Sequence, residues 1–152
     1  MITLHESTET LFTTNGLGTL SDAITCEVTE ERNGEFELEI EYPVTGIRYK
    51  ELRLRRIIMA KPNPYSDLQP FRIYAITKPI NGIVTVNAEH ISYDMSGYPV
   101  SAFVADTVQN AFINMKSASA VTCPFSFSTD KTTTANMTVL KPSSMRSLLG
   151  GV

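Results

Sequence analysis

The strongest pattern in this sequence is a strict alternation of charged and apolar residues over positions 35–42, in the order Glu35, Phe36, Glu37, Leu38, Glu39, Ile40, Glu41, Tyr42. Successive side chains of a β-strand point to opposite faces, so the pattern predicts a strand with one apolar and one carboxylate face. Ile24, Cys26 and Val28 alternate with polar residues just before it. The intervening Asn33-Gly34 pair tolerates the positive φ angles of a tight turn. We therefore predict a β-hairpin over residues 24–42.

A second hairpin is predicted from residues 70–80 and 83–88, which flank the turn pair Asn81-Gly82. Both segments carry apolar residues on both faces, which indicates a hairpin that is covered on both sides or that helps to close a barrel. Residues 56–60 predict a further strand, because the prolines of the following segment 61–64 force a loop. Short edge strands are predicted at 2–5 and 11–13, and a short helical turn within 46–54.

The pattern changes after Pro99. Apolar residues at helical spacing predict a helix over 105–116, with Asp106 as the N-cap and Gln109 as its capping-box partner. Residues 123–128 and 136–140 predict two strands around the polar loop 129–134. A short helix is predicted to open at Pro142-Ser143 and to end at Gly150.

Together these elements predict a mainly β protein with minor α content. Residues 1–103 are expected to form an antiparallel β-barrel-like domain, and residues 104–152 to begin a second, α+β domain. One hairpin and two helices bury too little surface to fold alone. We therefore expect the chain to be part of a longer polypeptide.

Composition narrows the classes of function. Of the 152 residues, 42% are hydrophobic and 19% charged, which suits a globular core. Sixteen acidic residues outnumber 13 basic ones, a balance that argues against nucleic-acid binding. No apolar run approaches the roughly 20 residues that span a bilayer, and no leader pattern is present, so we expect a soluble product made in a cytosol. Cys26 and Cys123 are expected to be reduced and buried.

The sequence offers no clear catalytic, cofactor-binding or metal-binding residues. Cys123 lies in a strand-like run, and no motif links it to a histidine, so a core cysteine is the better interpretation. Within 89–94, Glu89 and His90 would point to opposite faces of a strand. His90 and Asp94 could share a face, but two ligands do not make a metal site. Gly16-Leu17-Gly18 lacks the rest of a phosphate loop and predicts a turn.

Two charged clusters suggest surfaces instead. The carboxylates of Glu35, Glu37, Glu39 and Glu41 would be spaced roughly 6.5–7 Å apart on an exposed strand face, solvated or turned to a partner. The second cluster is basic, and it comprises Lys50, Arg53, Arg55 and Arg56. It is interpreted either as a solvated turn or as a surface that meets an acidic face of a neighbouring subunit.

Several segments resemble the N-terminal part of phage minor structural proteins, a family also known as prophage endopeptidase tail proteins. The likeness covers nearly the whole chain and is weakest over 117–138. It is carried by the segments Thr13-Thr14-Asn15-Gly16-Leu17-Gly18, Ala60-Lys61-Pro62-Asn63-Pro64, Gln69-Pro70-Phe71-Arg72-Ile73-Tyr74, Ile76-Thr77-Lys78-Pro79, Ala88-Glu89-His90-Ile91-Ser92-Tyr93-Asp94 and Ser144-Met145-Arg146-Ser147-Leu148-Leu149-Gly150-Gly151.

This resemblance implies a baseplate hub at the virion tail tip, in which three copies form a ring that closes the tail tube. The implied partners are other copies of the chain, tail tube proteins and distal tail proteins. Neither a cofactor nor nucleic acid nor a membrane is implied. Long members carry a C-terminal peptidase or other wall-degrading region, and that region has no counterpart here, so the endopeptidase activity is not carried over.

Two other functions stay open. A peptidoglycan-degrading tail endopeptidase would need a nucleophile or metal constellation, which the sequence does not show. A host-receptor or carbohydrate-binding module would need exposed aromatic residues. The chain has no Trp, and its candidates are Tyr65, Tyr93 and Tyr98.

Overall fold

The computed structural model describes residues 1–32 and 34–150, which form two compact units, Met1–Ile91 and Ser92–Val152. Strands account for 37% of the chain and helices for 16%, which confirms the prediction of a mainly β protein. Each unit has its own hydrophobic core, so the two are described in turn.

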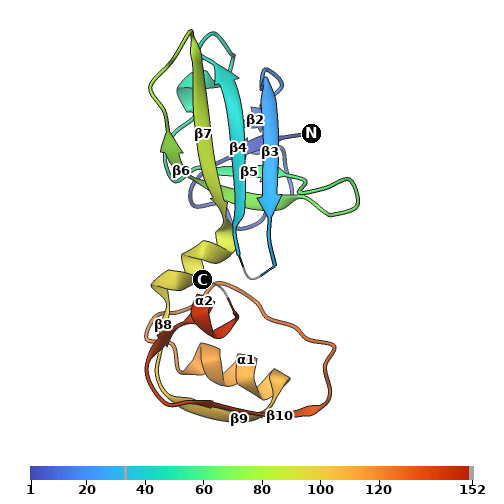
Figure 1. The fold of residues 1–152 in the computed structure, drawn as a ribbon, viewed down its shortest axis with the longest axis vertical. Coiled ribbons are helices and arrows are strands. Elements are labelled where there is room, and N and C mark those ends of the chain that lie inside the picture. The colour runs from blue at the N-terminus through green and yellow to red at the C-terminus, as the bar shows by residue number, and fades with distance from the viewer. Residues whose placement is uncertain (33, 151–152) are drawn as a thin grey trace. The chain divides into compact units, whose positions relative to one another are not determined.

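The first unit is a single antiparallel sheet of seven strands that curls into a half-barrel (Figure 1). In the sheet the strands follow the order β2-β1-β5-β6-β7-β4-β3. The strands are β1 (Thr3–His5), β2 (Gly18–Thr19), β3 (Thr25–Glu30), β4 (Phe36–Pro43), β5 (Ile57–Ala60), β6 (Gln69–Ile76) and β7 (Ile83–His90). A 3-10 turn, η1 (Tyr49–Glu51), precedes β5 and confirms the predicted helical turn. β2 and β3 are the two edge strands, so the sheet is a half-barrel rather than a closed barrel.

The first predicted hairpin is present as β3 and β4, with Cys26 opposite Ile40 and Val28 opposite Leu38. Of the apolar side chains of β4, Leu38, Ile40 and Tyr42 are buried, as the alternation predicted, and Phe36 is partly buried against the same core. Asn33, the first residue of the predicted turn pair, lies outside the described residues. The loop is closed by hydrogen bonds from Gly34 N to Glu31 O (3.1 Å) and from Glu31 N to Glu35 O (2.8 Å).

The second predicted hairpin is also confirmed, and its turn has the expected geometry. Asn81 and Gly82 have φ angles of 52° and 78°, as a two-residue turn with two left-handed positions requires. Ile80 and Ile83 exchange backbone hydrogen bonds of 2.9 and 3.0 Å across it. Further along the hairpin, the pairing of β6 with β7 shifts register between Ile73 and Ala75, which creates a bulge at Tyr74.

The N-terminal strands differ from the prediction of two edge strands. β1 lies inside the sheet, because it pairs with β2 on one side and β5 on the other. Residues 11–13 form no strand; Leu11 is exposed and the Phe12 ring packs edge-on against His5 at 5.2 Å. The neighbour of β1 is instead β2, held by the hydrogen bond from Leu17 N to Leu4 O (2.8 Å).

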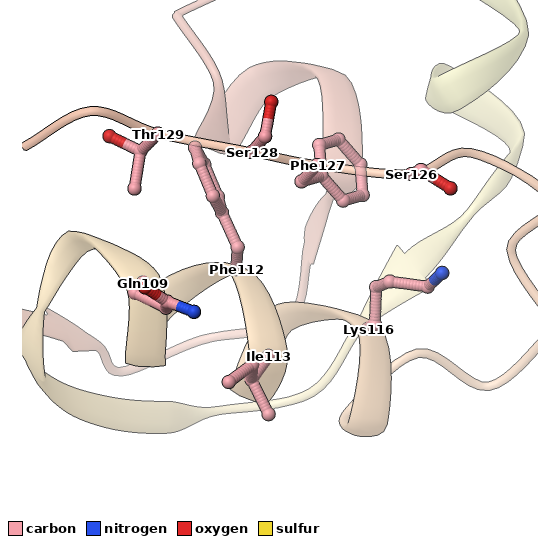
Figure 2. A pocket seen from close by; sticks show the side chains of 8 residues that line it. All are labelled: Gln109, Phe112, Ile113, Lys116, Ser126, Phe127, Ser128 and Thr129. Carbon is pink, nitrogen blue, oxygen red and sulfur yellow. The ribbon is translucent and has the colours of Figure 1, made fainter.

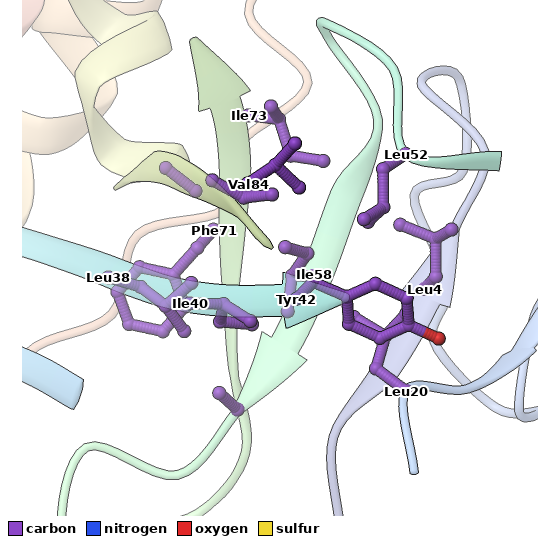
Figure 3. Close-up of a cluster of buried hydrophobic side chains, with 13 residues drawn as sticks. Leu4, Leu20, Leu38, Ile40, Tyr42, Leu52, Ile58, Phe71, Ile73 and Val84 are labelled. Carbon is purple, nitrogen blue, oxygen red and sulfur yellow. The ribbon is translucent and has the colours of Figure 1, made fainter. Parts of the chain in front are cut away.

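The buried side chains of the first unit gather in one hydrophobic cluster between the strands of the sheet (Figure 3). Its largest fully buried side chains include Tyr42, Phe71, Leu4 and Ile40. Each such side chain contributes about 1.5–3 kcal/mol by its removal from water. The Tyr42 hydroxyl donates a hydrogen bond to Asp22 Oδ2 at 3.3 Å. Burial of the phenol raises the pKa of Tyr42.

The second unit contains a two-stranded antiparallel sheet with a helix packed on it (Figure 1). Its elements are β8 (Pro99–Val100), β9 (Phe103–Thr107), α1 (Val108–Ser117), β10 (Thr134–Val139), β11 (Ser143–Ser144) and α2 (Met145–Leu148), and the 3-10 segment η2 (Ile91–Gly97) leads into them. β9 pairs with β10, and β8 with β11. Val100, Met115, Cys123 and Met145 form its buried core.

Two local predictions for this unit are wrong. The helix begins at Val108, and its N-cap is Thr107, whose Oγ1 accepts from Asn110 N at 3.1 Å; Asp106 belongs to β9. Residues 123–128 are in no strand, because β10 pairs with β9 instead. β10 therefore pairs with a strand whose last residues, 105–107, were predicted to be helical.

The two units divide after Ile91, whereas the predicted domain boundary followed residue 103. The physical reason is β8, in which Val100 pairs with Ser143 and packs with Met115 and Met145. Residues 92–103 thus belong with the second unit. That further sequence completes this unit stays a prediction.

Candidate functional site

One face of the first unit's sheet carries a group of carboxylates, here called the acidic face: Glu27, Glu37, Glu39 and Glu41. The last three lie on β4 opposite the buried side chains of Leu38, Ile40 and Tyr42. Glu27 of β3 stands directly across from Glu39, and both are exposed. Like charges at directly opposed positions destabilise a sheet slightly. Glu35, the fourth predicted carboxylate of this strand, is exposed just before β4 begins.

An exposed tyrosine belongs to the acidic face, and the sequence pattern did not reveal it. The bulge in β6 places Tyr74 so that its hydroxyl donates to Glu37 Oε2 at 2.9 Å. Partial burial and the neighbouring carboxylates, Glu37 first among them, raise the pKa of Tyr74 to about 12. The phenol is therefore a neutral hydrogen-bond donor at physiological pH.

Opposite charge is concentrated in the segment 47–55 between β4 and β5, here called the basic loop. Lys50, Arg53 and Arg55 are exposed there. Two apolar side chains stand among them, Ile47 with 80% and Leu54 with 58% of their surface exposed. Cations beside exposed apolar groups resemble the composition of protein interfaces, in which Arg is enriched.

Arg56, the fourth basic residue of the predicted cluster, has a structural role. Its guanidinium pairs with the Glu6 carboxylate at 2.9 Å and donates to the Glu51 carbonyl at 2.6 Å. These contacts fasten the start of β5 to the N-terminal segment. The solvent-facing cluster therefore consists of Lys50, Arg53 and Arg55.

The end of the basic loop is held in an unusual conformation. Arg55 has a φ angle of 73°, which is uncommon for a residue other than Gly. Its N–H donates to Ile73 O at 2.8 Å, and its carbonyl accepts from the Arg72 guanidinium at 2.9 Å. Arg72 is only 8% exposed and also donates to Ser7 O at 3.1 Å. A buried cation thus fixes the shape of an exposed basic turn.

The segment considered as a metal site has a packing role at the end of β7. The His90 ring stacks on Phe36 with a centroid distance of 4.4 Å, and Nε2 lies 3.3 Å from Gln69 Oε1. Glu89 faces Glu37 and Arg72 across the sheet. Among the described residues, no group of three or more His, Cys, Asp or Glu side chains is arranged to hold a metal ion.

Both cysteines are free thiols. Cys123 is buried in the second core, with its Sγ 3.4 Å from Met145 Sδ. Cys26 is only half-buried, on β3, where burial raises the pKa of its thiol. A raised pKa keeps a thiol protonated, and the protonated form is a weak nucleophile.

The three tyrosines considered for carbohydrate binding differ in exposure. Tyr65 is 98% exposed in the loop after β5. Tyr93 lies under the Arg146 guanidinium, 3.5 Å from the ring centroid, and Tyr98 packs edge-on against Phe125. Of these, Tyr65 alone presents a free aromatic face.

The second unit has a cavity of about 330 Å³ between α1 and the segment 126–129 (Figure 2). Phe112 points from the helix toward that segment, and its ring lies 5.4 Å from the ring of Phe127. Lys116 already donates to the Phe125 carbonyl at 2.8 Å. The described lining contains hydroxyls but no carboxylate, histidine or thiol. Sequence reasoning missed this cavity because its wall was interpreted as a paired strand.

A second, more apolar cavity of about 310 Å³ lies nearby in the same unit. Its lining residues are Val108, Ala111, Phe112, Met115, Met137, Leu148 and Leu149. These described residues include no titratable side chain, so the cavity has an apolar wall without an acid, a base or a nucleophile.

Gly16 lies in the tight turn that leads into β2, as predicted, and Gly18 is the first residue of that strand. Their φ angles are 55° and 131°, and a Cβ at Gly16 would lie 2.5 Å from the His5 ring. Gly16 therefore allows the chain to pass close to β1.

None of the helices described here has the length and hydropathy needed to cross a bilayer. No family model matches the sequence, and no curated protein matches it. The crystal structure of prophage tail protein gp18 from Listeria monocytogenes EGD-e is similar in structure, with a TM-score of 0.62 and 14% sequence identity. The match covers 97% of this chain and 43% of that one. The chain therefore has the same fold as a stretch of that tail protein and spans less than half of its length.

Proposed function

We propose that this chain is a structural component of a phage or prophage tail. The observation that carries the proposal is the match to a prophage tail protein over 97% of the chain, which extends through both units. The motif resemblance to phage minor structural proteins points in the same direction, and it was drawn from residues rather than from shape.

More specifically, we propose a baseplate-hub role at the tail tip. Three copies would form a ring at the end of the tail tube and contact tube and distal tail proteins. A curled β half-barrel suits this role, because its strand edges and charged faces offer contacts on several sides. In a longer product, the chain would mount a C-terminal region directed at the host wall. The gp18 chain is likewise more than twice as long as the part matched here.

The proposal is tested in particles obtained by inducing the phage that encodes the chain. Mass spectrometry should detect the chain among the virion proteins, and gold-labelled antibodies should mark one end of the tail in electron micrographs. Deletion of the gene should give incomplete or non-adsorbing tails. Normal infectious particles that lack the protein would contradict a tail role.

Two assays of the purified chain distinguish this function from its rivals. Release of soluble fragments from peptidoglycan would favour the endopeptidase. Binding to a glycan array that is lost in Tyr65→Ala would favour a carbohydrate-binding module. A structural tail component gives neither signal.

A further inference from the structure

The first unit presents two surfaces of opposite charge that its own folding does not pair. Within the described part of the chain, no ion pair engages Lys50, Arg53 or Arg55 of the basic loop. The same holds for Glu39 and Glu27 of the acidic face. Both sets of side chains are exposed and available to a partner.

The basic loop has the features of a contact surface. Ile47 and Leu54 expose apolar side chains among its cations, although neither is needed to cover the core. The left-handed conformation of Arg55 costs folding free energy, and the buried guanidinium of Arg72 maintains it. Strain that the surrounding structure imposes on an exposed turn suggests that the shape of the turn is used.

The acidic face has the complementary features. The directly opposed carboxylates of Glu27 and Glu39 repel each other, and no cation of the described chain relieves them. Tyr74 adds an exposed aromatic ring beside Glu37. Guanidinium groups both pair with carboxylates and stack on aromatic rings, so an arginine-rich loop fits this surface.

We infer that the basic loop of one copy of this chain docks on the acidic face of a second copy. The inference rests on the proposed assembly role and names the surfaces that would perform it. Because the two surfaces differ, the contact is head-to-tail, and such contacts close into a ring when the rotation between copies allows it. Charge complementarity would set the orientation of the copies and make the assembly sensitive to salt.

The test uses charge reversal in the whole chain, followed by sedimentation velocity at low and high salt over a wide concentration range. One variant reverses the loop (Lys50→Glu with Arg53→Glu), a second reverses the face (Glu27→Lys with Glu39→Lys), and a third combines all four changes. Lys61→Glu with Lys141→Glu is the matched control, because both lysines are exposed outside the two surfaces. Thermal unfolding verifies that each variant is folded.

We expect the wild-type chain to self-associate at low salt. The affinity of self-association should be lower by about tenfold or more in each variant with one reversed surface. The four-fold variant should recover self-association, since its loop and face are again opposite in charge, but it should not mix with the wild type. The control should behave as wild type.

Three results would overturn the inference: a wild-type chain that stays monomeric, folded double variants that associate as well as wild type, or a folded four-fold variant that does not recover. A loop variant that self-associates normally but no longer binds a tube or distal tail protein would assign the loop to that partner. Each of these leaves the tail role intact if the chain is still found in particles. Absence of the wild-type chain from particles would instead remove the proposed function itself.

Discussion

At the scale of single residues, the pair formed by Tyr74 and Glu37 has a measurable electrostatic signature. Burial and the adjacent carboxylates disfavour the tyrosinate and raise the pKa of Tyr74 from 10 to about 12. Glu37→Gln should lower that pKa, because it removes the negative charge that accepts a hydrogen bond from the Tyr74 hydroxyl and disfavours the tyrosinate. Ultraviolet titration of wild type minus Tyr74→Phe isolates this group from the other tyrosines. A Tyr74 transition near 10 in the wild type would contradict the assignment.

The same shift makes a prediction about stability. A pKa that is higher in the folded than in the unfolded state contributes stability that is complete below pH 10 and is lost as the pH rises toward 12. Over that range, the free energy of unfolding of the wild type should therefore fall more steeply than that of Tyr74→Phe. Chemical denaturation at several pH values measures this difference.

Arg72 is the residue on which the shape of the basic loop depends. Arg72→Leu should destabilise the protein by about 2–4 kcal/mol, because the Arg55 and Ser7 carbonyls lose a charged donor in a buried place. Arg53→Leu, at an exposed position of the same loop, should change stability by less than about 0.5 kcal/mol. Urea unfolding compares the two, and equal effects would show that Arg72 does not anchor the loop.

At the scale of elements, the hairpin of β6 and β7 depends on a turn with two left-handed residues. Gly82→Ala should cost about 1–2 kcal/mol, because an L side chain at a φ of 78° is strained. A Cβ there would meet only Val44 at 3.9 Å, so the cost is conformational rather than steric. Gly97→Ala is the control: its φ is not positive and its Cβ would meet nothing within 4 Å. Thermal unfolding should separate the two variants, and equal midpoints would contradict the turn assignment.

At the scale of the whole molecule, the proposed hub role predicts an oligomer. Light scattering on the complete gene product that contains this chain should give the mass of three copies, with a fall in mass at high salt if charged surfaces contribute. This follows from heterologous contacts that close into a ring. A complete product that is monomeric under all conditions would count against the hub while leaving another position in the tail open.

Much of the fold follows from local patterns in the sequence. The two-residue alternation of β4 specifies which side chains are buried, since shifting a strand by one residue would expose all of them. Asn81-Gly82 specifies its turn because few other pairs accept two positive φ angles. The carboxylates of β4 and the exposed cations Lys50, Arg53 and Arg55 also follow from the sequence, whereas the ion pair of Arg56 with Glu6 does not, because it joins residues far apart in the chain.

Only the tertiary structure decided which segments pair and which polar groups are buried. Residues 103–107 became β9 because residues 134–139 lie beside them, a contact between positions far apart in sequence that overrides local helical spacing. The buried role of Arg72 could not be predicted from the sequence, because its guanidinium donates to the carbonyls of Ser7 and Arg55, which only the folded chain brings close to it. The amino-acid sequence thus determined the β character, both hairpins and the charged surfaces, whereas long-range pairing determined the sheet order, the division after Ile91 and the buried support of the basic loop.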